Sequence, residues 1–437
     1  MRNRTRTTRQ LASSRKLIPP LPRPVWALIG LHALAGLAIG IVLAFLVVYL
    51  HFVRGIGLEW AGVAFAALPV GEMVMGPLAG GLADRFGPRH VIATCGIIAA
   101  ASAAALSFVA APWQAVLVGL AFGVGMTAFE SPFYTLLAIS VAREQRSAVF
   151  AVDYAVVALG WGAGGFLGGM VVRISSVASF QAAFSMASAA FLTFALAVLT
   201  TGSTTVSDDV SDDEPAKDSG PGGYHSVFAD RCLRRIMVLS VLLMCFAYVQ
   251  FDVTFPAVAI GDAHVGTRTI GICFMANMLV VAGGQLFMLR YLQGRRRTRA
   301  MVCMFIFPAA SWVLVLIAAH VGGGLPAATL LVVSFIVVGF GEMTWAPSVP
   351  GMVNDLAPAN LRGHYNAGNS FAEAIGRLVG PVLAGFMLAR GLTDAWLIII
   401  AITLPAAIPI VFDLERRVPD RANRIGAGAP PLMVPPP

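Results

Sequence analysis

The strongest constraint in this sequence is a series of twelve apolar runs separated by shorter polar segments. A helix of about 20 apolar residues crosses a bilayer, where only helices and closed barrels satisfy all of their backbone hydrogen bonds. The chain is 58% hydrophobic and only 12% charged, unlike a soluble domain. We therefore predict an all-α integral membrane protein. The expected spans are 25–53, 60–83, 90–111, 113–139, 147–173, 178–200, 236–260, 268–292, 299–320, 325–350, 364–390 and 394–413.

The 30 lysine and arginine residues give a net charge of +8 and fall almost entirely in alternate loops. The exceptions are Arg54, Arg173, Arg268, Arg377 and Arg390. Cytoplasmic loops are enriched in lysine and arginine, so this asymmetry indicates a multi-pass protein of the cytoplasmic membrane with both termini in the cytoplasm. The positive charge then reports orientation, and we expect no nucleic-acid partner.

The polar segments divide the chain into two halves. The segment 201–235 contains six closely spaced acids, and its composition favours a solvated linker over a cation-binding or regulatory loop. The arginine- and serine-rich start also resembles a transit peptide, but we favour a cytoplasmic tail. The expected units are a tail at 1–24, a six-helix bundle at 25–200, the linker at 201–235, a second six-helix bundle at 236–413 and a tail at 414–437.

The two halves share an internal repeat. Aligning Arg146 with Arg362, at an offset of 216 residues, brings several further positions into register. These pairs are Asp153 with Asn369, Gly160 with Gly376, Gly164 with Gly380 and Gly169 with Gly385. Two parallel six-helix repeats are typical of transporters that bind substrate between the halves, near the middle of the membrane.

The polar segment between the second and third spans reads GPLAGGLADRFGPRH (76–90) and fits the pattern GxLADRxGxR. It resembles the signature loop of the major facilitator superfamily. The fitted residues include Gly80, Asp84, Arg85, Gly87 and Arg89. The resemblance implies a latch that holds the cytoplasmic side shut in one state, with Asp84 meeting the start of the eleventh span near His364. Pro88 stands where that family usually has a basic residue.

Physical reasoning supports two roles in this stretch. Glycines at four-residue spacing let the second helix approach a neighbour backbone to backbone. The carboxylate of Asp84 can accept hydrogen bonds from the start of a neighbouring helix. We therefore expect the glycines to pack and the charges to latch.

The fifth span contains GWGAGGFLGG (160–169), which resembles the fifth-helix motif of the drug:proton antiporter branch of the same superfamily. The eleventh span carries a related run, GRLVGPVLAG (376–385). The expected helix-packing and bending residues are Gly160, Gly164, Gly168, Gly169, Gly376, Gly380 and Pro381. The fourth-span segment GVGMTAFESPF, followed by REQR, resembles a bacterial multidrug-resistance subgroup of that branch.

Ionisable residues inside the spans are the candidate functional groups, because a charge in hydrocarbon costs at least about 2.5 kcal/mol. The resemblance places the first, fourth, seventh and tenth spans around a central cavity. The candidates for proton or substrate binding are Glu72, Glu130, Asp252 and Glu342. Glu373 and Arg377 are spaced i, i+4, which favours a structural ion pair. We interpret Asp153 as a snorkelling or capping residue and His32 as a hydrogen-bonded core residue.

These features predict a transporter that exports lipophilic, cationic compounds in exchange for protons. A carrier of sugars or other small metabolites on the same fold is the alternative, and a receptor without transport activity is a third possibility. The chain has no HExxH, GxSxG or GxxxxGK motif and no histidine or cysteine metal spacing, so we do not expect an enzyme or a metal site. We expect no cofactor, a proton gradient as the energy source and a monomer in the lipid bilayer.

Overall fold

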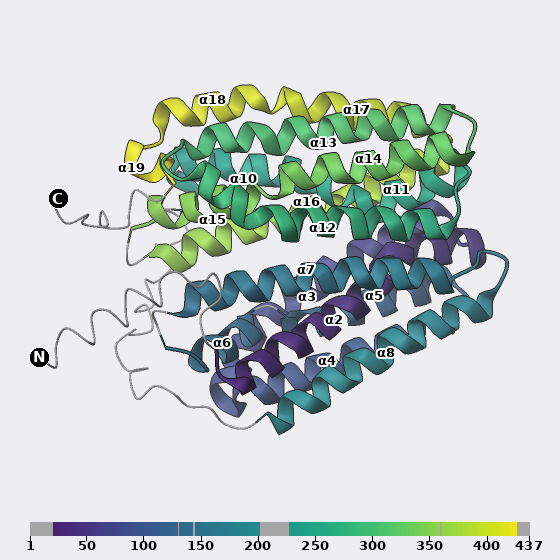
Figure 1. Cartoon of the computed structure of the whole chain (residues 1–437), viewed down its shortest axis with the longest axis horizontal. Helices are drawn as coiled ribbons and strands as arrows, with labels where there is room; N and C mark the ends of the chain where they lie inside the picture. The colour runs from purple at the N-terminus through teal and green to yellow at the C-terminus, as the bar shows by residue number, and fades with distance from the viewer. Residues whose placement is uncertain (1–20, 130, 143–144, 202–226, 359–360, 426–437) are drawn as a thin grey trace, which may run out of the picture.

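The computed structural model describes residues 21–129, 131–142, 145–201, 227–358 and 361–425. Twelve helices in these ranges are long and apolar enough to cross a membrane, which confirms the predicted all-α fold and its number of spans. Figure 1 shows two bundles lying side by side, one from the first half of the chain and one from the second. The glutamate Glu130 and the acidic cluster of the linker lie outside the described residues.

The first bundle consists of six spans, two of which contain a segment that is not α-helical. A π-helical turn, Tyr49–Val53, follows α2, and a 3-10 turn, Thr127–Phe129, follows α5. The helices are α2 (Arg23–Val48), α3 (Leu58–Phe86), α4 (Pro88–Leu106), α5 (Pro112–Met126), α6 (Ser131–Ile139), α7 (Arg146–Val171) and α8 (Val177–Thr200).

The second bundle repeats this arrangement. A π-helical segment, Met244–Tyr248, separates α10 from α11. The helices are α10 (Arg231–Leu243), α11 (Gln250–Gly261), α12 (Thr267–Leu292), α13 (Arg297–His320), α14 (Gly324–Glu342), α15 (Trp345–Leu356), α16 (Arg362–Ala389), α17 (Thr393–Ala406), α18 (Ile408–Arg417) and α19 (Asp420–Asn423).

The helices run between two ends of the molecule. We call the end of the molecule where α2, α4 and α16 begin the near end, and the end where α3 and α17 begin the far end. At the near end, α3 and α4 are joined by Gly87 alone, whose φ of +83° is accessible to glycine without strain. Pro88 then occupies the first turn of α4, where its missing N–H costs no hydrogen bond.

Glycines hold α2 and α7 together backbone to backbone. A Cβ on Gly160 or Gly164 would overlap the carbonyl oxygen of Ala33 or Leu37 on α2. Gly36 and Gly40 of α2 approach the carbonyl oxygens of Val157 and Trp161 in the same way. Gly168 lies against the ring of Phe45.

Equivalent glycines of α16 pack against the seventh span. A Cβ on Gly376 would lie 2.7 Å from the carbonyl oxygen of Val241, and one on Gly380 would lie 2.7 Å from that of Cys245. The positions matched by the repeat therefore make matched contacts within the two halves.

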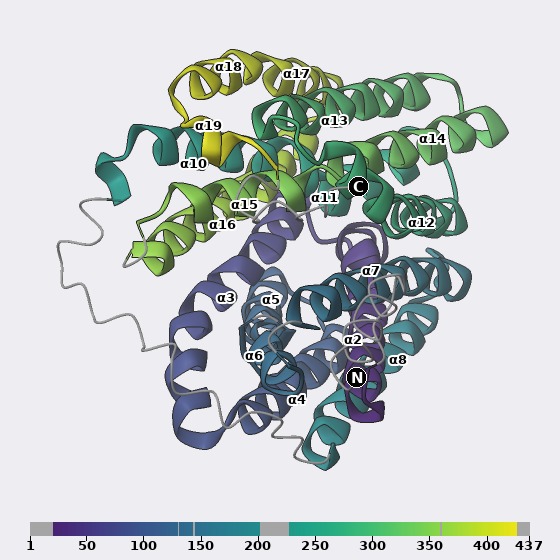
Figure 2. The same cartoon turned by 60° about the vertical axis from the view of Figure 1, so that its left-hand side comes forward.

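Two further glycine contacts join the halves at the far end. Gly169 of α7 lies against the backbone of Thr267 and Gly271 of α12. Its repeat partner, Gly385 of α16, lies against Leu58 of α3, where Gly62 also meets Pro381. Figure 2 shows α3 reaching from its own half to α16, in agreement with this contact. The far end is therefore closed by two symmetry-related crossings.

The second bundle extends beyond its predicted bounds at both ends. Helix α10 begins at Arg231, because the side chain of Asp230 caps its first turn by accepting hydrogen bonds from the N–H groups of Cys232 and Leu233. The last span continues to Arg417, into the region predicted as a tail. Residues through 425 then pack back on α13, where the side chain of Asn423 accepts hydrogen bonds from Thr298.

Candidate functional site

The tenth span is broken at Glu342. Helix α14 ends at this residue, Thr344 donates a hydrogen bond to the carbonyl of Gly341 (2.6 Å), and α15 begins at Trp345. The repeat places Glu342 opposite Met126, where α5 also ends. Discontinuous membrane helices expose backbone groups that bind substrates and ions in transporters, so the paired breaks mark the candidate site.

Glu342 is held by an amide from the neighbouring helix. The Nδ2 of Asn277 on α12 donates to Oε2 of Glu342 (3.3 Å) and to the carbonyl of Phe335 (3.2 Å). The Glu342 side chain is partly exposed, and within the described part of the chain it makes no ion pair. One carboxylate is therefore positioned without a positive charge to neutralise it.

Asp252, on the seventh span, lies close to Glu342 of the tenth span. The two carboxylates are near enough for their charges to interact. The preceding π-helical segment is stabilised by Gln250, which donates from Nε2 to the carbonyl of Cys245 (2.7 Å). A distorted helix thus brings the second acid toward the first.

Aromatic side chains border the two acids. Tyr248 and Trp345 meet edge to face with ring centroids 6.4 Å apart, and the Tyr248 hydroxyl has no hydrogen-bond partner among the described residues. Tyr154 of α7 is 39% exposed and interacts electrostatically with Glu342 across the boundary between the halves. Aromatic faces beside unpaired carboxylates suit an organic cation.

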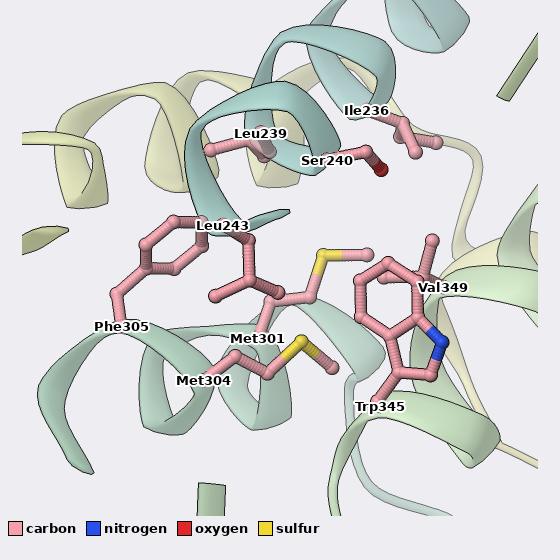
Figure 3. A pocket seen from close by; sticks show the side chains of 9 residues that line it. All are labelled: Ile236, Leu239, Ser240, Leu243, Met301, Met304, Phe305, Trp345 and Val349. Carbon is pink, nitrogen blue, oxygen red and sulfur yellow. The ribbon is translucent and has the colours of Figure 1, made fainter. Parts of the chain in front are cut away.

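Trp345 lines a small apolar pocket. Figure 3 shows Trp345 and Val349 of α15 opposite Ile236 and Ser240 of α10. Its volume is only about 10 Å³, enough for roughly one water molecule. Pockets that bind drug-sized ligands commonly have a volume of about 300 Å³ or more. This pocket is therefore a packing gap beside the helix break.

Glu72 occupies a different position from the other acids. Its Oε2 lies 3.1 Å from Nη2 of Arg377, so this ion pair joins α3 of one half to α16 of the other. Within α16, Glu373 accepts a hydrogen bond from Asn369 (2.7 Å), and the expected pair of Glu373 with Arg377 stays a prediction. Arg377 reaches α3 because the glycine crossing brings the two helices together.

The predicted latch residues lie apart from the acids, at the near end. Asp84 and Arg85 are exposed, and the Arg85 guanidinium lies 5.2 Å from the ring centroid of Phe86. A Cβ on Gly80 would meet nothing within 4 Å. The predicted glycine packing of this stretch is therefore absent from this conformation, and α3 uses Gly62 and Gly71 for its close contacts instead.

Sequence reasoning missed one buried pair. His32 of α2 and Asp153 of α7, interpreted separately as a core residue and a capping residue, contact each other with Nδ1 3.0 Å from Oδ2. His32 lies one helical turn before Gly36, and Asp153 lies one turn before Val157, which Gly36 contacts. This register is set by a contact between distant spans, so the sequence alone carried no signal for the pair.

The fold and site define a membrane transporter of two six-helix halves with its polar groups at helix breaks between them. The sequence profile of the Major Facilitator Superfamily matches residues 28–321 and 237–435. This chain belongs to that superfamily. No curated protein sequence matches the chain.

Solved structures agree with this fold. A nucleoside transporter, NupG, is 16% identical with a TM-score of 0.70, covering 90% of this chain and 99% of its own. An auto-inhibited peptide transporter of the POT family is 15% identical with a TM-score of 0.70, covering 91% and 97%. A bacterial homologue of the human lysosomal transporter Spinster, inward-facing and occupied, is 11% identical with a TM-score of 0.71, covering 91% and 97%. These similarities establish the fold and leave the substrate open.

Proposed function

We propose that this protein exports lipophilic cations in exchange for protons. The observation that carries the proposal is the pair of carboxylates on α14 and α11, Glu342 and Asp252, which border aromatic rings and make no ion pair in the described part of the chain. Acids inside a membrane that lack a neutralising partner bind protons or cations.

The mechanism is competition for these carboxylates. An organic cation that enters the site is stabilised by a carboxylate charge and by the faces of Tyr248 and Trp345, and it displaces the proton. Proton binding from the other side of the membrane removes the negative charge and releases the cation. Each carboxylate therefore serves substrate and proton in turn, which couples the two fluxes.

The orientation of the chain indicates which side of the membrane the site faces in this conformation. The near end carries most of the basic loops, so by the positive-inside rule we assign it to the cytoplasm. The far end is closed by the two glycine crossings, so this conformation corresponds to an inward-facing state. The similar Spinster homologue was also solved in an inward-facing state.

Two observations disfavour the alternative substrates. The amides of Asn277 and Gln250, which could recognise sugar hydroxyls, are occupied by Glu342, Phe335 and Cys245. The spans that carry the acids contain no arginine between the helix break and the far end, which disfavours an anionic substrate. A lipophilic cation fits the remaining groups best.

The test uses purified protein in proteoliposomes with an imposed pH gradient and tetraphenylphosphonium as the probe. We expect accumulation of the probe against its gradient with stoichiometric proton movement in the opposite direction. Glu342→Gln and Asp252→Asn should abolish the accumulation. The matched control is Glu59→Gln, which changes an exposed glutamate at the far end.

Two outcomes decide the proposal. Loss of accumulation in the site variants with retention in the control supports it. Accumulation that is unchanged in both site variants, or a wild-type protein that moves nucleosides or peptides and no organic cation, excludes it.

A further inference from the structure

His32 and Asp153 form a buried ionisable pair that the competition at Glu342 does not use. Nδ1 of His32 lies 3.1 Å and 3.0 Å from the two carboxylate oxygens of Asp153. His32 is 3% exposed and Asp153 is completely buried. Both lie inside membrane spans, where an ionisable group needs a partner or a function.

The helix packing fixes this pair in place. Helices α2 and α7 run in the same direction, and Gly36 and Gly40 contact Val157 and Trp161 at a constant sequence separation. His32 and Asp153 continue the same register by one turn, toward the near end. Because the glycine contacts set this register, the imidazole and the carboxylate are held together in this conformation.

Aromatic rings of the broken fourth span enclose the imidazole. The ring centroid of Phe133 lies 4.0 Å from that of His32, and those of Phe129 and Tyr134 lie 6.1 Å away. This enclosure is adjacent to the break that corresponds to Glu342 in the other half. The pair therefore contacts the element that mirrors the candidate substrate site.

Other ionisable groups lie on most of the surrounding helices. The sequence of α8 contains none. The α12 helix, packed on α7, carries Arg268, Cys273, Arg290 and Tyr291, and α11, packed on α2, carries Asp252. On α7 itself Arg146 donates to the carbonyl of Ala138, and Tyr154 interacts electrostatically with both Tyr134 and Glu342. Helix α3 carries Glu59, Glu72, Asp84 and Arg85, and Glu130 lies outside the described residues.

The possible protonation states of this pair differ in net charge. With one proton shared between imidazole and carboxylate, as imidazolium and carboxylate or as two neutral groups, the net charge is zero. Removing that proton leaves one buried negative charge, and adding another leaves one buried positive charge. Both changes are costly in a buried site, so the pair is suited to exchange one proton only when the surroundings change.

We propose that the His32–Asp153 pair is a second proton-binding site, which belongs to the first half and couples its protonation to the packing of α2 and α7. Both helices contact the second half, α2 through α11 and α7 through α12. A change of charge at the pair therefore acts on the helices that form the boundary between the halves. The coupling of this site to substrate transport rests on the proposed function. The change of conformation with protonation does not depend on the substrate.

The first experiment compares two modes of transport in proteoliposomes with tetraphenylphosphonium. Proton-driven accumulation needs proton release and rebinding, whereas exchange of labelled for unlabelled probe at equal pH does not. We expect His32→Gln and Asp153→Asn to reduce driven accumulation by about tenfold or more while exchange changes less than about twofold. Loss of both modes in properly folded variants indicates a structural role and overturns the proposal, as does retention of driven accumulation.

The second experiment needs no substrate. Hydrogen–deuterium exchange of the near ends of α3 and α16, corrected for the intrinsic effect of pH, reports how open that end is. In the wild-type protein, the protection of these helix ends from exchange should differ between acidic and neutral pH. Both the His32→Gln and the Asp153→Asn variant should lose this difference. A pH response retained in both variants overturns the proposal. If the wild-type protein ignores the probe but shows the pH response, the proposed substrate fails and the proton site stands.

The chain provides a matched control. His320 and Asp394 form another histidine–aspartate pair, 3.2 Å apart, but both side chains are exposed at the far end. His320→Gln should leave both experiments unchanged. The exchanged double variant, His32→Asp with Asp153→His, restores a proton-binding pair and should recover part of the driven accumulation; failure to recover in a folded, exchange-competent protein counts against the proposal.

Discussion

Glu72 of α3 and Arg377 of α16 form an ion pair, 3.1 Å long, that connects the two halves of the transporter. The side chains are 21% and 40% exposed, respectively, and the Arg377 Nε has no hydrogen-bond partner among the described residues. The pair lies on the same helix crossing as the contact between Gly62 and Pro381. It therefore stabilises the arrangement that closes the far end.

Removal of one partner should weaken this arrangement. We expect Glu72→Gln to lower the stability of the folded protein by about 1 kcal/mol, because the pair is only partly buried. The exchanged double variant, Glu72→Arg with Arg377→Glu, should recover most of the loss. Thermal unfolding in detergent measures the effect, and equal stability of all three proteins would contradict a role for the pair.

The glycines of α7 and α3 should respond differently to the same substitution. Gly164→Ala inserts a methyl group where the carbonyl oxygen of Leu37 lies, so the thermal midpoint should fall by the equivalent of about 1–3 kcal/mol. Gly80→Ala meets open space and should leave the midpoint unchanged. If Gly80 packs in the other state of the cycle, as the latch prediction requires, Gly80→Ala slows transport without a loss of stability. Equal effects on stability at both positions would refute this distinction.

Tyr248 should contribute its aromatic face to cation binding. Tyr248→Phe keeps the ring and removes a hydroxyl that has no partner among the described residues, so the affinity for an organic cation should be nearly unchanged. Tyr248→Leu removes the ring and should weaken binding by about 0.5–2 kcal/mol. Calorimetry with tetraphenylphosphonium separates the two variants. A larger loss in the phenylalanine variant would assign the hydroxyl a direct contact with the substrate.

Asp262 should make stability depend on pH. Burial and the neighbouring Asp394 raise the pKa of this carboxyl, while His264 and His320 partly oppose them. A raised folded-state pKa means that the stabilising contribution of the protonated form is lost as pH rises through that value. Asp262→Asn should therefore raise the unfolding temperature at neutral pH, by the equivalent of less than about 1 kcal/mol in stability, because the group is only partly buried. No gain is expected in acid; a gain that is independent of pH would contradict this cause.

The segment after α18 should be part of the folded unit. Arg297 donates a hydrogen bond to the carbonyl of Ala422 (2.7 Å), and Gly294 donates to that of Ile425 (2.9 Å). A chain shortened after Arg417 should lose these contacts and unfold at a lower temperature. A chain shortened after Ile425 should keep them and unfold like the full-length protein, and equal stability of the two shortened chains would disprove the anchoring.

The sequence was sufficient to predict the features that depend on residues near one another along the chain. Apolar runs, charge asymmetry and the repeat at an offset of 216 residues predicted twelve helices in two related halves, because hydropathy and periodicity depend on neighbours along the chain. The same repeat identified the glycines, and the structure shows why they match: Gly160 and Gly376 pack within their halves, and Gly169 and Gly385 pack between them. The assignments of Glu342, Asp252 and the latch residues to transport are still predictions.

Pairing between distant spans was decided only by the tertiary structure. Arg377 pairs with Glu72 of the other half, and Asp153 had a membrane surface within reach, yet it pairs with His32. In both cases a glycine contact brings two backbones close enough for a side chain to find a partner across the interface. Sequence alone determined which residues enter the membrane; which charges neutralise one another depended on the register at which the helices pack, because that register is fixed by contacts between residues far apart in the chain.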